Sequence, residues 1–283
     1  MTLGEAIRDA VQRLGQAGVE SPQIDVEWLL ADLLSCSRSE ILLRTETNLT
    51  AEERDRLARR VERRARREPL QHILGTANFL GYDFRVSAEV LIPRPETEVL
   101  VELALEFLEH LPRPAVFDLG TGSGCLAITL AKHCPKANII GSDVSEAALG
   151  LARSNAESLD ALGQVEFRYA DGLTALAKGE QVDLILSNPP YIPTADIDSL
   201  QPEVRDHDPR LALDGGVDGL RFYRLLATEG QSRLRRGGRL MAEFGDGQER
   251  AVAGLFQQAA WPSLEISNDL TGRPRIVIAS AGH

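Results

Sequence analysis

The sequence is poor in cysteine, in metal-ligand clusters and in long apolar runs, and each shortage excludes a class of protein. Its three cysteines are irregularly spaced and too few for a disulfide framework or a zinc site, so we expect no metal and ordinary thiols in a reducing compartment. No apolar run approaches the ~20 residues that a membrane-spanning helix requires. The amphipathic start MTLGEAIRDAVQRLG contains acids and is typical of neither a signal nor a transit peptide. These features predict a cytoplasmic protein.

Lysine is also scarce, and acidic residues outnumber basic ones, 42 to 31. The chain has three lysines and a net charge of −11, which argues against a general nucleic-acid binder because phosphate contacts need clustered cations. One stretch differs, and its arginines are Arg54, Arg56, Arg59, Arg60, Arg63, Arg64, Arg66 and Arg67. We interpret this cluster as the solvated face of a helix, with a partner-docking patch as the minority alternative.

The first seventy-five residues have apolar positions at helical spacing. Pro22 is typical of a helix start, and Thr50 followed by Glu53 is a capping-box pattern that begins an arginine-rich helix running to about Arg67. We therefore predict a helical domain over residues 1–75. A β-hairpin linker is predicted over 76–95, and the turn PRPETE opens a helix over 96–110.

From Pro114 onward, short apolar strands alternate with amphipathic helices. The predicted strands are 115–120, 137–143, 164–171, 181–188, 238–244, 263–267 and 274–280. This alternation predicts an α/β, Rossmann-like domain over residues 96–283, with a parallel sheet covered by helices on both faces. The last two strands have no helix between them, so we expect an antiparallel hairpin at one edge of the sheet.

A glycine-rich loop, Asp118-Leu-Gly120-Thr121-Gly122-Ser123-Gly124, follows the first of these strands and opens a helix. Glycines there let the backbone approach a ligand closely. The dinucleotide fingerprint does not fit, because Cys125 stands where its third glycine belongs. The spacing instead resembles the loop that binds S-adenosylmethionine (AdoMet) in Rossmann-like methyltransferases.

Acidic residues end the next two strands. Asp143 is placed to accept the hydroxyls of a ribose, although it could instead cap the following helix, a role for which Ser145 competes. By resemblance to the same fold, the turn Asp171-Gly172 lies near the adenine ring. Because AdoMet carries a sulfonium cation and no phosphate, acids around the loop suit it better than a dinucleotide.

The tetrapeptide Asn188-Pro189-Pro190-Tyr191 follows the fourth strand, at the edge where open α/β sheets bind ligands. Alone it would be a proline turn, but in an AdoMet-type fold it resembles the signature of methyltransferases that act on planar nitrogen. Such a nitrogen is a poor nucleophile because its lone pair is delocalised. The Asn188 side-chain oxygen and the Pro189 carbonyl are candidate acceptors for its two N–H groups, and Tyr191 is a candidate to pack against the flat acceptor.

Together with LIPRPETE, EPLQHILGTANFLGYDF and SNPPYIP, these motifs make nearly the whole chain resemble the HemK/PrmC family, the protein-(glutamine-N5) methyltransferases of peptide chain release factors. The resemblance implies methyl transfer from AdoMet to the glutamine of the Gly-Gly-Gln motif in class 1 release factors. It also implies that the helical domain over residues 1–75 and the hairpin linker help to hold that substrate. It implies that Asn188, Pro189, Pro190 and Tyr191 hold the substrate. The implied AdoMet site comprises Gly120, Thr121, Gly122, Ser123, Gly124, Asp143, Asp171, Gly172 and Asn188.

Three other functions stay open at this point. A nucleic-acid amino methyltransferase shares the NPPY motif, and a nucleotide-dependent oxidoreductase would use the glycine loop for NAD. The third is a non-catalytic scaffold with the AdoMet fold, which the intact glycine loop and Asn188 disfavour.

Arg94 and Glu96 are candidate supports near the mouth of the site and could equally be a salt-bridged helix start. Glu243 is expected beneath the active site, with an ordinary strand-end acid as the alternative. We assign no role to His72 and His207 and expect neither a membrane nor a nucleic acid as partner.

Overall fold

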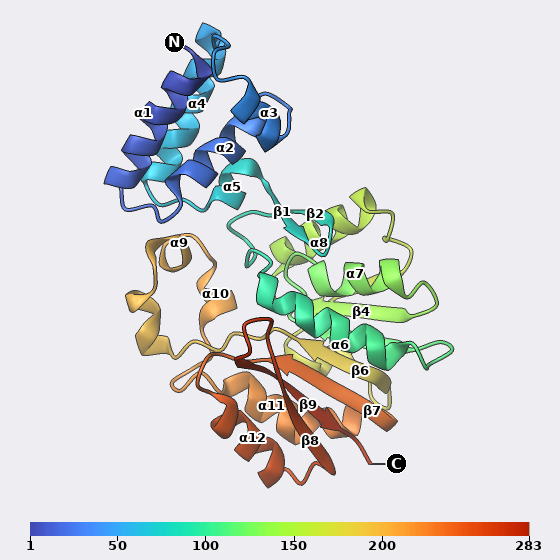
Figure 1. The fold of residues 1–283 in the computed structure, drawn as a ribbon. Coiled ribbons are helices and arrows are strands. Elements are labelled where there is room, and N and C mark those ends of the chain that lie inside the picture. The colour runs from blue at the N-terminus through green and yellow to red at the C-terminus, as the bar shows by residue number, and fades with distance from the viewer. Residues whose placement is uncertain (283) are drawn as a thin grey trace. The chain divides into compact units, whose positions relative to one another are not determined.

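The computed structural model describes residues 1–282. The chain forms two compact units (Figure 1). The first unit contains Met1–Thr76 together with Gln201–His207, and the second contains residues 77–200 and 208–282. The segment 201–207 therefore packs with residues that precede it by more than a hundred positions, and nothing in its sequence predicted this.

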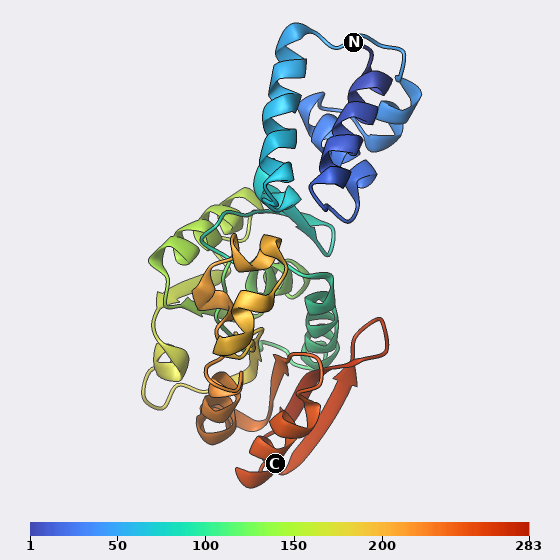
Figure 2. The same cartoon turned by 90° about the vertical axis from the view of Figure 1, so that its left-hand side faces the viewer.

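The first unit is helical. Its helices are α1 (Leu3–Gln16), α2 (Pro22–Leu33), α3 (Arg38–Leu43), α4 (Ala51–Ala65), α5 (Leu70–Leu74) and, from the returning segment, α9 (Pro202–Arg205). The predicted capping box is confirmed, since Thr50 and Glu53 bond reciprocally at the start of α4. Leu14, Leu29 and Leu30 are fully buried where α1, α2 and α4 pack together, and Figure 2 shows α4 beside α1.

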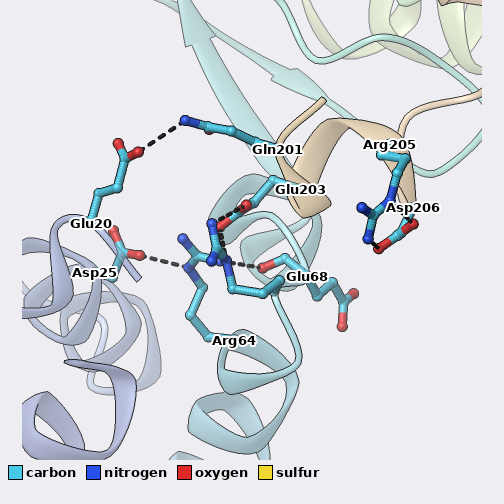
Figure 3. A network of polar contacts seen from close by, with 9 residues as sticks. Glu20, Asp25, Arg64, Glu68, Gln201, Glu203, Arg205 and Asp206 are labelled. Atoms are coloured by element: carbon cyan, nitrogen blue, oxygen red, sulfur yellow. Dashed lines mark hydrogen bonds and ion pairs between the residues drawn. The ribbon is translucent and has the colours of Figure 1, made fainter. Parts of the chain in front are cut away.

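The arginine cluster is not simply a solvated face, so that interpretation is wrong for part of it. Arg64 is buried and donates through Nε to Asp25 (2.6 Å) and through Nη1 to Glu203 (2.9 Å), as Figure 3 shows. Arg67 adds two hydrogen bonds to the same Glu203 carboxylate, both 2.6 Å long. The cost of burying Arg64 and Glu203 is offset because Arg64 bonds to two carboxylates and Glu203 bonds to two guanidinium groups. The cluster therefore ties the segment 201–207 to α2 and α4.

We expect Glu203→Gln to destabilise this part of the first unit by about 3 kcal/mol, because the buried Arg64 loses one of its two carboxylate partners and Arg67 loses its ion pair as well. The measurement is hydrogen exchange of the amides at the end of α4 and in α9. Glu62→Gln is the matched control, since Glu62 also accepts from two arginines, Arg13 and Arg66, but at an exposed position. That control should cost less than about 1 kcal/mol. Equal protection in the two variants would contradict the anchoring role of Glu203.

The second unit begins with a short hairpin of β1 (Thr76–Phe79) and β2 (Tyr82–Arg85), which is shorter than the predicted linker. Phe79 and Phe84 are fully buried in the core of this unit and meet edge to face. Leu80, at φ 46°, and Gly81, at φ 82°, form the turn between the strands. A 3-10 turn, η1 (Pro95–Thr97), then leads into α6 (Glu98–Leu108).

A seven-stranded sheet organises the rest of the second unit, in the order β5-β4-β3-β6-β7-β9-β8. The strands are β3 (Ala115–Leu119), β4 (Asn138–Asp143), β5 (Val165–Tyr169), β6 (Val182–Ser187), β7 (Leu234–Glu243), β8 (Ser263–Asn268) and β9 (Pro274–Ser280). Strands β3 to β7 pair in parallel, and β9 pairs antiparallel with both β7 and β8. The predicted parallel sheet and antiparallel edge hairpin are both confirmed.

Helices cover both faces of this sheet (Figure 1). The remaining elements are α7 (Cys125–His133), α8 (Glu146–Ser158), η2 (Gly172–Ala175), η3 (Thr194–Ser199), α10 (Arg210–Leu213), α11 (Arg221–Glu229), η4 (Gly230–Arg233) and α12 (Glu249–Gln258). Alternate residues of β6 point to opposite faces: Leu184 and Leu186 pack with α6 and α7, whereas Ile185 packs with α11 and α12. Nowhere in residues 1–282 is a helix both long and apolar enough to span a bilayer.

Candidate active site

A cavity of about 670 Å³ opens at the carboxyl ends of β3, β4 and β6. This is the edge at which parallel α/β sheets bind ligands. Most of the site residues predicted from the sequence line this one cavity. They are Gly120, Thr121, Gly122, Ser123, Asp143, Asp171, Gly172, Asn188, Pro189 and Pro190.

The glycine loop is shaped to leave room in the cavity. Gly120 and Gly122 have φ angles of 74° and 54°, and a Cβ added to either would meet no protein atom within 4 Å. Gly124 differs, because it does not line the cavity and its Cβ would lie 2.7 Å from Cδ1 of Ile128. The close packing of α7 and α8 explains the glycine at position 124, and its contact with the cofactor stays a prediction.

Strand-end acids also separate into two kinds. Asp143 lines the cavity, and its carboxylate accepts from the backbone N–H groups of Gly122 (3.0 Å) and Ser145 (2.9 Å). Asp118 is fully buried outside the cavity lining and accepts from the hydroxyl of Thr121 (2.7 Å). Burial raises the pKa of Asp118 to about 7. Asp143 can thus meet a ligand, whereas Asp118 supports the loop from behind.

Asn188 presents a free acceptor at the cavity. Its Nδ2 donates to Oγ1 of Thr97 (2.9 Å), and its Oδ1 is buried with no hydrogen-bond partner within residues 1–282. A buried amide oxygen without a partner is costly, so such an atom in a cavity wall indicates a place where a ligand donor belongs. Pro189 lies beside it in the same wall.

Tyr191 is not part of the cavity lining, although its neighbour Pro190 is, and its packing against the acceptor stays a prediction. Its ring packs on the hydrophobic cluster formed by β7, α11 and α12, and burial raises its pKa to about 12. Its backbone carbonyl accepts from Nε2 of Gln248 (2.9 Å), and a Cβ on Gly219 would come within 2.3 Å of that same oxygen. Tyr191 thus anchors the end of the NPPY loop.

Three buried residues, Thr97, Glu243 and Tyr223, form a hydrogen-bonded group next to Asn188. Thr97 donates its hydroxyl proton to Oε2 of Glu243 (2.6 Å), and burial raises the pKa of Glu243 to about 7. Tyr223 donates to the backbone carbonyl of Glu243 (2.6 Å). Glu243 was a candidate support in the sequence, whereas Thr97 was missed, although it lies inside the PRPETE motif.

The other candidates occupy the rim or lie outside it. Arg94 lines the cavity and forms an ion pair with the buried Asp208 at 2.7 Å. Glu96 is exposed and does not line the cavity. A residue that sequence reasoning missed, Asn155 of α8, is fully buried and donates to the carbonyls of Ser123 (2.9 Å) and Arg85 (3.0 Å). It fixes the glycine loop, and its partners lie too far away in the chain for a local pattern to reveal them.

Comparison with known proteins finds two family matches and close relatives. The PrmC N-terminal domain family matches residues 5–75, and the methyltransferase small domain family matches residues 98–202. The chain is 44% identical to the release factor glutamine methyltransferase of Geobacter sulfurreducens, over 93% of this chain and 91% of the relative. It is 40% identical to the enzyme of the same name from Koribacter versatilis, over 98% of both chains.

A solved structure supports the fold independently. The crystal structure of a methyltransferase from Pyrococcus furiosus is similar to this chain with a TM-score of 0.54 and 19% sequence identity. The similarity covers 78% of this chain and 99% of that one. At this identity the likeness concerns the fold alone, and it agrees with the Rossmann-like sheet described above.

Proposed function

The chain belongs to the release factor glutamine methyltransferase family, and from this premise we propose that it methylates N5 of the glutamine in the Gly-Gly-Gln motif of class 1 release factors. It is an AdoMet-dependent methyltransferase. The observation that carries the choice of acceptor is the buried, unpartnered Oδ1 of Asn188 in the cavity wall. We assign recognition of the release factor to the helical domain of residues 1–75.

The cavity fits AdoMet. The open space over Gly120 and Gly122 accepts its amino-acid part, Asp143 is available to ribose hydroxyls, and Asp171 and Gly172 line the wall assigned to the adenine. When bound there, AdoMet supplies an electrophilic methyl group on a sulfonium.

The chain's own residues then orient the acceptor. Oδ1 of Asn188 and the carbonyl of Pro189 accept the two N–H groups of the glutamine amide, which holds its nitrogen towards the methyl group. The prolines stiffen the loop, because each fixes φ and lacks an N–H. No strong base is required before attack, since the alkylated nitrogen becomes acidic and loses its proton afterwards. Catalysis thus rests on orientation and on preorganised acceptors.

A nucleic-acid amino methyltransferase is the alternative, because adenine and guanine also present a planar NH2 group. The net charge of −11 counts against it. The arginine cluster gives this alternative little support, because Arg64 and Arg67 already bond to Glu203 and are not free to bind phosphate groups.

The deciding experiment incubates the protein and labelled AdoMet with a class 1 release factor, and in parallel with DNA and ribosomal RNA. We expect label in the release factor, and a mass spectrum should place a single methyl group on the Gly-Gly-Gln glutamine. A release factor with that glutamine changed to asparagine is the control and should stay unlabelled. Label in nucleic acid alone would overturn the proposal.

A further inference from the structure

A chain of two hydrogen bonds runs from the cavity wall into the core. Asn188 donates from Nδ2 to Oγ1 of Thr97 over 2.9 Å, and Thr97 donates to Oε2 of Glu243 over 2.6 Å. Thr97 and Glu243 are both about 2% exposed, so water does not compete for these bonds. The three residues come from η1, the end of β7 and the loop after β6, which are far apart in the sequence.

The direction of these bonds is fixed by the number of protons available. A threonine hydroxyl has one proton, and an ionised carboxylate can only accept. When Thr97 gives its proton to Glu243, its oxygen can only accept from Asn188. The amide must then turn its NH2 group towards Thr97, which leaves Oδ1 at the cavity wall without a partner.

We propose that Thr97 is a positioning residue which, together with Glu243, holds the Asn188 amide with its oxygen facing the acceptor nitrogen. The inference rests on the proposed function, because it matters only if Asn188 accepts from a substrate NH2 group. A reversed amide would place its own NH2 group against that of the substrate, and two donors would face each other. Thr97 also lines the cavity, and its hydroxyl is engaged by Asn188 on one side and Glu243 on the other, so it sets the polarity of the site through the Asn188 amide.

Thr97→Val tests this with an almost isosteric side chain that lacks the hydroxyl. We expect kcat to fall about tenfold or more, with KM for the release factor changed by less than about twofold. Thr97→Ser, which keeps the hydroxyl, should recover most of the rate. Thr129→Val is the matched control, because Thr129 is a fully buried threonine on α7 that does not line the cavity. Unchanged kcat in Thr97→Val would overturn the proposal.

A double-mutant cycle separates positioning from a loss of packing. If Thr97 acts only through Asn188, Thr97→Val should lower kcat no further once Asn188 is alanine. A full additional loss in the double variant would mean that Thr97 supports the fold rather than the amide, and the proposal would fail.

An observation that needs no substrate keeps the inference separate from the proposed function. In protein labelled with 15N-asparagine, the side-chain NH2 resonance of Asn188 is identified by its disappearance in Asn188→Ala. We expect its protons to exchange slowly with water in the parent and in Thr97→Ser, and faster in Thr97→Val. Equal exchange in all three proteins would overturn the positioning role, whatever the acceptor of the methyl group proves to be.

The rate should also depend on the ionisation of Glu243. Burial raises its pKa to about 7. The charged and titratable groups that face it are Arg94, Glu96, Tyr191, Tyr223 and Arg275. A protonated Glu243 can donate to Thr97, which then donates to Oδ1 of Asn188 and turns the amide over. Lowering the pH through about 7 should therefore lower kcat.

Glu243→Gln is the test of this pH dependence, because it removes the titrating group and keeps an amide oxygen that can accept from Thr97. We expect the inflection of kcat near pH 7 to disappear in the variant. Asp118, whose pKa burial also raises to about 7, is intact in that protein. An unchanged inflection would exclude Glu243 as its source and would contradict the role given to it here.

Discussion

Replacing Asn188 by alanine is expected to lower kcat by about 10²–10³-fold, while AdoMet affinity falls by much less. The variant removes an acceptor that lies in the cavity wall and has no other partner in the described chain. In the variant, only the Pro189 carbonyl is left to accept an N–H group of the substrate amide. The nitrogen is therefore no longer held in line with the methyl group. The loss corresponds to about 3–4 kcal/mol of transition-state stabilisation.

Two measurements are needed, namely single-turnover methyl transfer to the release factor and titration of AdoMet by calorimetry. Asn138→Ala is the control, since Asn138 is an exposed asparagine at the start of β4, at the opposite end of that strand from Asp143. It should leave both values unchanged. Near-parental turnover in Asn188→Ala would remove the asparagine oxygen from the mechanism, and with it the main support for an amide acceptor.

Much of the fold was predictable because its signals are local. The capping box at Thr50, the proline at the start of α2 and the alternating strands from residue 115 each depend on neighbours in the sequence. The cavity was predictable for a related reason, since the motifs follow strands whose carboxyl ends share one edge of a parallel sheet.

What the sequence did not reveal depends on contacts between distant residues. Thr97 lies 91 positions from Asn188 and 146 from Glu243, so no spacing rule connects them. Glu203 is one acid among many until the fold brings it to Arg64 and Arg67. The motifs that contain Gly124 and Tyr191 did not reveal that helices α7 and α8 pack against Gly124, or that Tyr191 packs against the hydrophobic core.

The second large effect is expected for Gly122→Val, which should abolish measurable AdoMet binding. The space that a Cβ would enter at Gly122 holds no protein atom within 4 Å and belongs to the cavity wall. A valine side chain would therefore occupy the volume of the ligand. It would also strain the backbone, because the residue has a φ of 54°, at a cost of about 1–3 kcal/mol for a side chain forced into this region.

Gly179→Val separates the steric effect from the strain. Gly179 has a φ of 83°, lies in open space and does not line the cavity, so its valine variant carries a comparable backbone penalty without blocking the ligand. Thermal unfolding should show similar losses of stability in both variants, whereas calorimetry should show AdoMet binding only in Gly179→Val. If Gly122→Val bound AdoMet as tightly as the parent, the glycine loop would not face the cofactor, and the placement of AdoMet over it would be wrong.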